Sequence, residues 1–130
     1  MTDFGLQRGN ARWGGALAPV PRGPDEFMEV LGGAGSTRVE RIVSQGHASP
    51  EGFWYDQDEW EWVIVIQGAA ELEFEGGRQH AMKAGDWIVI PPHERHRVAR
   101  TSLEPPCVWI AVFAVPDRTD AIRRPGCCPS

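Results

Sequence analysis

Residues 61–77, with the sequence EWVIVIQGAAELEFEGG, decide the fold class of this chain. Five consecutive apolar residues follow the first glutamate, which is the pattern of a β-strand covered on both faces. Residues 70–75 then alternate between apolar side chains and glutamates, as in a strand with one buried and one solvated face. The Gly76-Gly77 pair that follows is typical of a two-residue hairpin turn. The stretch therefore predicts consecutive β-strands joined by tight turns.

Similar short patterns continue on both sides of this stretch. Val39, Ile42 and Val43 mark an earlier strand. Later strands are predicted over residues 78–83, 86–90, 96–101 and 107–115. Glycines and prolines separate these segments, and the strands recur roughly every ten residues. This spacing predicts an all-β protein that is either an antiparallel sandwich or a closed barrel.

The two ends of the chain lack this pattern. The first segment is rich in glycine, proline and arginine without any period, so it is interpreted as an extended arm. Residues 24–31 predict one short helix, because Pro24 and the acids beside it suit a first helical turn and Gly32-Gly33 would end it. We therefore expect one domain overall, with the arm and short helix over residues 1–36, a barrel over 37–115 and a tail over 116–130.

The overall composition narrows the class of partner. The chain has 130 residues and a formal charge of −5, with no concentrated basic face, so a nucleic-acid partner is disfavoured. No apolar run is long enough to cross a bilayer and the first residues lack a secretory signal, so we expect a cytoplasmic protein without a membrane partner. Of the three cysteines, Cys107 is expected in the core, and Cys127 and Cys128 in the tail.

Two motifs resemble those of the cupin family. The first cupin motif ends in a glutamate, six further residues and a glycine, and Glu61 and Gly68 match this half. Its earlier half holds two histidines in the pattern His-x-His, and these places fall on Tyr55 and Gln57 here. The first motif is therefore matched only in its second half.

The second cupin motif is matched more closely. It reads glycine, five residues, Pro-x-Gly, two residues, histidine, three residues and asparagine. Gly85, Pro91 and His96 take their places in it, whereas His93 stands at the usual glycine and Arg100 at the usual asparagine. The resemblance implies a single-domain cupin barrel, the double-stranded β-helix or jelly-roll fold, similar to small bacterial cupins.

Strand geometry predicts that two motif residues share one cavity. Because side chains alternate along a strand, Glu61 lies on the same face as Val63 and Val65, and His96 on the same face as Val98. If these valines line the barrel, Glu61 and His96 point into its mouth. A carboxylate there is costly unless it is paired, protonated or bound to a metal. Both residues are therefore candidate catalytic residues.

The cupin resemblance also implies a divalent metal, held by the two first-motif histidines, the motif glutamate and the second-motif histidine. Both first-motif histidines are missing here, which leaves two hypotheses open. In one, His93 turns inward and joins Glu61 and His96, with Gln57 as a weaker ligand, around Fe, Mn, Ni or Zn. In the other, His93 faces solvent and the pocket binds metal loosely or not at all.

Aromatic residues are dense just before the motif glutamate. Phe53 and Tyr55 are candidates for the wall or lid of the pocket, where they would contact a small-molecule ligand. Trp60 and Trp62 alternate with Glu61 and so face away from the pocket, which favours outer-layer packing or an interface. We therefore expect a homodimer.

Two classes of function fit these features. The first is an enzyme of oxygenase, isomerase or lyase type, in which a bound metal activates a small substrate or Glu61 acts as a general base. The second is a cupin that binds a small molecule without converting it, which the loss of both first-motif histidines favours. The metal content of the purified protein separates the two classes most directly.

Overall fold

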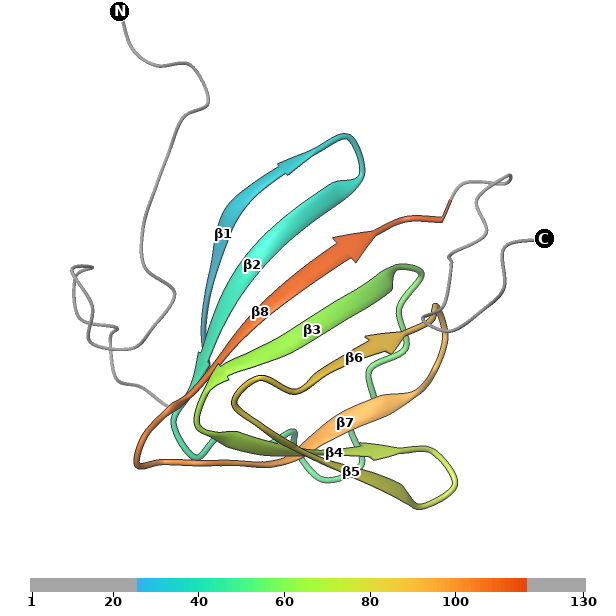
Figure 1. Ribbon diagram of the computed structural model, residues 1–130. Coiled ribbons are helices and arrows are strands. Elements are labelled where there is room, and N and C mark those ends of the chain that lie inside the picture. The colour runs from blue at the N-terminus through green and yellow to red at the C-terminus, as the bar shows by residue number, and fades with distance from the viewer. Residues whose placement is uncertain (1–25, 117–130) are drawn as a thin grey trace, which may run out of the picture.

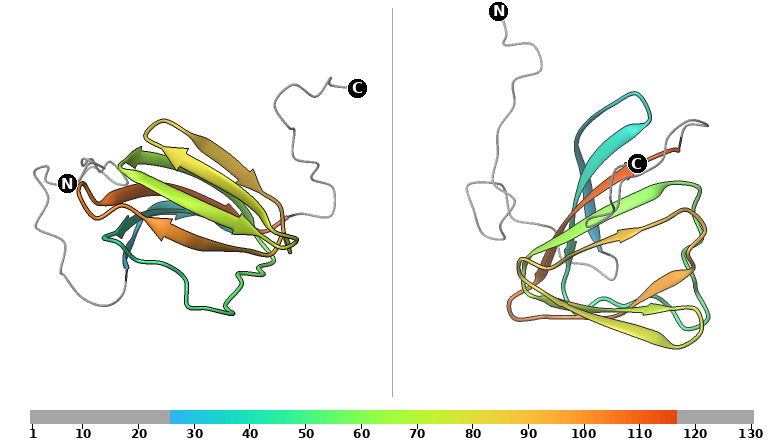
Figure 2. Two further views of the ribbon diagram at one scale, coloured as in Figure 1. Left: turned by 90° about the horizontal axis from the view of Figure 1, so that it is seen from below. Right: turned by 45° about the vertical axis from the view of Figure 1, so that its right-hand side comes forward.

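The computed structural model describes residues 26–116, which form eight antiparallel strands in two sheets (Figure 1; Figure 2). The strands are β1 (Phe27–Ala34), β2 (Thr37–Ser44), β3 (Trp60–Gln67), β4 (Ala69–Phe74), β5 (Arg78–Lys83), β6 (Trp87–Ile90), β7 (His96–Thr101) and β8 (Cys107–Ala114). The larger sheet has the order β1-β2-β8-β3-β6 and the smaller has the order β5-β4-β7. The fold is all-β, a double-stranded β-helix of the jelly-roll type. Within the described residues, no helix is long or apolar enough to cross a membrane.

The strands from β3 onward begin and end within one residue of the ranges expected from the sequence. Both glycines of the predicted hairpin, Gly76 and Gly77, lie in the turn between β4 and β5 and have positive φ. On β4 the apolar side chains of Ala70, Leu72 and Phe74 are buried, as their alternation predicts. Period and turn chemistry therefore fix this half of the molecule locally.

The outward face of β4 carries an ion-pair ladder with β7 and the turn before it. Oε1 of Glu73 lies 3.0 Å from the guanidinium of Arg97. In the same way, the carboxylate of Glu75 pairs with Arg95 at 2.6 Å, and that of Glu71 lies 3.8 Å from Arg100. The arginines therefore line the outer side of the smaller sheet.

The predicted helix near the start is wrong, because Phe27–Ala34 forms strand β1. Its residues pair antiparallel with β2, from Phe27 opposite Val43 to Ala34 opposite Thr37. Phe27 packs against the buried side chains of Val43 and Val108. Gly33 does not end a helix: a Cβ there would lie 2.3 Å from the backbone oxygen of Thr37, so the glycine permits the close approach of the two strands. The arm over residues 1–24 and the cysteines at 127 and 128 lie outside the described residues.

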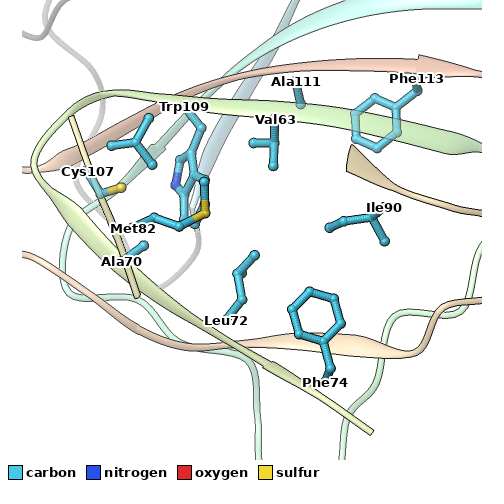
Figure 3. Close-up of a cluster of buried hydrophobic side chains, with 11 residues drawn as sticks. Val63, Ala70, Leu72, Phe74, Met82, Ile90, Cys107, Trp109, Ala111 and Phe113 are labelled. Carbon is cyan, nitrogen blue, oxygen red and sulfur yellow. The ribbon is translucent and has the colours of Figure 1, made fainter. Parts of the chain in front are cut away.

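The hydrophobic core lies between the two sheets, where buried side chains from both meet (Figure 3). They are Val63, Val65, Ala70, Leu72, Phe74, Met82, Ile90, Cys107, Trp109, Ala111 and Phe113. Cys107 is fully buried, as expected, and burial raises the pKa of its thiol to about 12, with a further contribution from the charge of Glu26. This cysteine is therefore a packing residue and not a nucleophile.

Candidate functional site

A cavity of about 80 Å³ lies between the two sheets, against the core. Its walls are mainly apolar, with Ile42, Val63, Leu72, Val98 and Trp109 among the lining side chains. Its polar groups come from strands β2, β3 and β7, from the residue just before β1 and from the loop between β2 and β3. Such an apolar cavity with a few convergent polar groups is the usual form of a small-molecule site.

The structure brings Glu61 and His96 together in this cavity. Glu61 points inward from β3 on the same face as the buried Val63 and Val65, and its side chain is 12% exposed. His96 is the first residue of β7, and its side chain is 5% exposed. The Nε2 atom of His96 lies 3.6 Å from Oε1 of Glu61, slightly beyond hydrogen-bond distance. The two side chains therefore face each other as a buried acid–base pair.

Neighbouring groups fix the orientation of the His96 ring. Its Nδ1 lies 2.8 Å from the carbonyl oxygen of Glu94, which can only accept, so Nδ1 carries a hydrogen and Nε2 faces Glu61. Tyr55 stacks on the ring with centroids 5.4 Å apart, and backbone hydrogen bonds in both directions join Tyr55 and His96. Burial lowers the pKa of His96, but the Glu61 carboxylate and the Glu94 carbonyl outweigh it, so the pKa is raised overall.

Two residues from the loop between β2 and β3 complete this side of the cavity. The amide nitrogen of Gln57 donates a hydrogen bond of 3.0 Å to Oε1 of Glu61. Tyr55 lines the cavity, and burial, together with the charges of Glu26 and Glu61, raises the pKa of its phenol. The phenol therefore keeps its proton and acts as a donor. These are the positions at which the cupin resemblance places two histidines.

Phe53 and His93 lie outside the cavity wall. Phe53 packs edge-on against Tyr55, with ring centroids 4.8 Å apart, and is itself exposed. His93 is at the surface, with a side chain 63% exposed that contacts Asp56 through Nδ1 at 2.7 Å and Asp58 through Nε2 at 3.1 Å. The hydrogen bond to Asp56 raises the pKa of His93, opposed slightly by desolvation. The structure therefore does not bring His93 together with Glu61 and His96.

The donor set of the cavity does not fit the metal site that the resemblance implies. Among residues 26–116, no three histidine, cysteine, aspartate or glutamate side chains are grouped so that they could hold a metal ion. Glu61 and His96 supply one carboxylate and one imidazole, and Gln57 turns its amide nitrogen, which is not a metal ligand, toward the carboxylate. Among residues 26–116, these two are the strong donors that face each other closely, which is fewer than the three that catalytic metal sites commonly have.

Two glutamates that the sequence reasoning missed also line the cavity, Glu26 and Glu40. Glu40 points inward from β2 beside Ala111, and its carboxylate pairs with Arg38 at 2.6 Å. Glu26 precedes β1 and accepts a hydrogen bond from Ser44. Period two from Ile42 could have placed Glu40 on the inner face. Glu26 carried no such signal, because its segment was interpreted as a helix.

Comparison with known proteins agrees with the fold. A family model described as Cupin domain matches residues 39–113. A proposed mannose-6-phosphate isomerase from Ralstonia eutropha is 44% identical and superposes with a TM-score of 0.75, covering 84% of this chain and 98% of that chain. No curated protein matches the sequence.

More distant solved structures share the fold alone. KdgF from a Halomonas species is 22% identical, with a TM-score of 0.60 over 76% of this chain and 86% of that chain. A Klebsiella pneumoniae protein with a double-stranded β-helix domain is 21% identical, with a TM-score of 0.62 over 74% of this chain and 82% of that chain.

Proposed function

The chain belongs to the cupin family, and from this premise we propose that its barrel cavity is the active site of a small proton-transfer enzyme of the isomerase type. One observation carries the proposal. A carboxylate and an imidazole, both largely buried, face each other across 3.6 Å inside a cavity. Acid–base pairs of this kind, held in an apolar site, serve proton transfer in enzymes.

The pair suits the isomerisation of an α-hydroxy carbonyl compound. Glu61 takes the proton from the carbon that bears the hydroxyl, and Nε2–H of His96 gives a proton to the carbonyl oxygen, which leaves an enediol. His96 then takes the proton of the other hydroxyl, and Glu61 returns its proton to the neighbouring carbon. The proton count closes, and no oxidant, reductant or co-reactant is needed.

The neighbours of the pair act as positioning residues. The side-chain amide of Gln57 donates a hydrogen bond of 3.0 Å to Oε1 of Glu61, which fixes the orientation of the carboxylate in the cavity. The backbone carbonyl oxygen of Glu94 accepts a hydrogen bond of 2.8 Å from Nδ1 of His96, which leaves Nε2 free to contact the substrate. The phenol of Tyr55 lines the same cavity and is available to donate to a substrate oxygen.

The Ralstonia protein supports only the reaction class. Its name refers to an isomerase, and it is 44% identical to this chain. Its named substrate is a phosphorylated hexose, whereas the cavity here measures about 80 Å³. An engineered cavity of about 150 Å³ holds one benzene ring. The buried part of the substrate is therefore a group of a few heavy atoms.

Deuterium exchange tests the proposal. In D₂O, the wild-type protein should exchange the hydroxymethyl protons of hydroxyacetone, followed by proton NMR. Because general acid–base groups contribute about 10²- to 10⁴-fold, the Glu61→Gln variant should lose activity by that factor. Glu75→Gln, on the outer face of the smaller sheet, is the matched control and should exchange at the wild-type rate. Absence of exchange by the wild-type protein with both hydroxyacetone and glyceraldehyde would overturn the catalytic proposal and leave a binding role.

A metal-dependent reaction is the second candidate, because the side chains of Glu61 and His96 both face the same cavity. Protein purified without added metal would then hold stoichiometric Fe, Mn, Ni or Zn, and His96→Ala would lose it. The metal-free proposal predicts exchange that survives chelation. If exchange disappears on chelation and returns when one of these ions is added, the metal-free proposal is overturned and the reaction is metal-dependent.

A further inference from the structure

One residue in the turn between β6 and β7 has an unusual backbone conformation. Among residues 26–116, His93 is the one residue other than glycine with a positive φ, at 62°. Residues with a Cβ adopt this left-handed region uncommonly, whereas glycine enters it freely. The cupin motif usually has glycine at this place. A glycine would therefore suit the backbone better, so the imidazole side chain needs an explanation of its own.

The imidazole ring spans two aspartates of the loop between β2 and β3. Its Nδ1 donates to Oδ1 of Asp56 at 2.7 Å, because a carboxylate can only accept, and its Nε2 lies 3.1 Å from Oδ1 of Asp58. The hydrogen bond to Asp56 and the charges of both aspartates outweigh desolvation and raise the pKa of the ring, which favours its charged form. The backbone N–H of His93 also donates to the carbonyl oxygen of Gln57 at 2.8 Å. His93 therefore contacts three consecutive residues of the loop.

The middle one of these three residues is joined to the reacting pair. Gln57 is partly buried between its exposed neighbours, and its side-chain amide donates a hydrogen bond of 3.0 Å to Oε1 of Glu61. The contacts of His93 fix the chain on both sides of Gln57 and at its carbonyl oxygen. Building on the proposed function, we propose that His93 is a positioning residue that holds the Gln57 amide on the Glu61 carboxylate and so sets the direction of the base in the cavity.

The stability of the fold does not account for these contacts. The side chain of His93 is 63% exposed, and those of Asp56 and Asp58 are 47% and 85% exposed. Ion pairs at such exposed positions contribute little to the free energy of unfolding. The left-handed backbone of His93 acts in the opposite direction, because its Cβ is crowded there. A contact that adds little stability and requires an unfavourable backbone is explained by the group that it positions.

NMR of the Gln57 side chain tests the positioning without any substrate. In the wild-type protein one amide proton of Gln57 should lie downfield of its place in a free side chain, because it is bonded to Glu61. His93→Gly removes the ring, keeps the backbone N–H and suits the positive φ, so the barrel should unfold at about the wild-type temperature. The Gln57 resonance should nevertheless move toward its free position. His80→Gly removes the same ring from the exposed strand β5 and is the matched control.

The kinetics of deuterium exchange test the consequence for the reaction. Because His93 lies outside the cavity wall, His93→Gly should leave the KM for hydroxyacetone unchanged. Its kcat should fall about 10- to 100-fold, because the base is no longer held in its productive direction. His93→Arg should restore much of this loss, since a guanidinium can donate to both aspartates. His80→Gly should keep the wild-type kcat.

Three results would overturn the inference. They are an unchanged Gln57 amide in His93→Gly, an unchanged kcat, and a fall in kcat that accompanies a lower unfolding temperature and is not restored by His93→Arg. In each case deuterium exchange by the wild-type protein would still stand. Absence of exchange by the wild-type protein, with a displaced Gln57 amide in His93→Gly, would instead overturn the proposed function and leave His93 as the residue that positions Gln57.

Discussion

At the scale of single residues, Glu61 and His96 each account for the other's burial. A lone carboxylate inside an apolar barrel would be strongly unfavourable, whereas here an imidazole faces it, and Gln57 and Glu94 hydrogen-bond to the two side chains. Removal of one partner therefore leaves the other buried and uncompensated. The state of His96 reports on this coupling most directly.

The Glu61→Gln variant should lower the pKa of His96. In the wild-type protein burial lowers this pKa, and the Glu61 carboxylate and the Glu94 carbonyl raise it above the ordinary value. Without the carboxylate the desolvation effect dominates, so the imidazole should titrate at lower pH than in the wild type. NMR titration of the imidazole carbon resonances measures this shift. An unchanged titration curve would mean that the pair does not interact.

The same shift has a consequence for stability. A histidine with a raised pKa stabilises the fold fully below its unfolded pKa, near 6.5, and this contribution is lost as the pH rises through the folded pKa. Relative to wild type, Glu61→Gln should therefore destabilise the fold more at pH 5.5 than at pH 8.5.

At the scale of strands, the sequence contained enough information for the barrel but not for its edge. Strands β3 to β8 follow from period two and from glycine and proline turns, which are local signals. For β1, Pro24, the nearby acids and Gly32-Gly33 are equally typical of a short helix, and the choice is made by distant contacts. Phe27 pairs with Val43 on β2, and no local pattern contains that information.

The same distinction holds for the site. Glu61 and His96 could be placed from alternation along their strands, because each lies next to valines that face inward. The direction of the His93 side chain could not be predicted in this way. His93 lies in a turn, with φ of 62°, and its ring contacts Asp56 and Asp58 from another loop. Glu40 was predictable from its strand, and Glu26 depended on the missed β1.

The approach of β1 to β2 gives a prediction with a matched control. Gly33→Ala would place a Cβ 2.3 Å from the Thr37 oxygen, so the strands must separate, at a cost of about 1–3 kcal/mol of unfolding free energy. Gly32→Ala adds the same methyl group with no atom within 4 Å and should be nearly neutral. Urea denaturation of both variants measures the difference. Equal stabilities would mean that β1 and β2 do not pair as described.

At the scale of the whole molecule, the outer face of strands β3, β6 and β8 in the larger sheet is apolar. On β3, Trp62 lies beside Val89 of β6 and Val112 of β8, and Ile64 lies beside Trp87 and Ile110 in the same way. Trp60 stacks with Trp62, and Trp87 is 54% exposed. The outward positions of these three strands carry no charged side chain. We propose that a second copy of the chain covers this face, because a twofold axis can pair it with itself without opposing like charges.

Sedimentation equilibrium tests the dimer. The wild-type protein should have twice the 14.4 kDa mass of one chain, and Trp87→Glu should shift it toward the monomer. Gln79→Glu adds the same charge on the exposed strand β5 of the other sheet and should leave the dimer intact. A wild-type monomer at high concentration would refute this interface.

The central claim is that Glu61 and His96 act as one unit in proton transfer, and a double-mutant cycle on deuterium exchange into a small hydroxy ketone tests it most directly. Glu61→Gln and His96→Asn should each reduce the exchange rate by about 10²- to 10⁴-fold, and the double variant should be no slower than the slower single variant. Exchange at the wild-type rate in either single variant, in folded protein, would contradict the account.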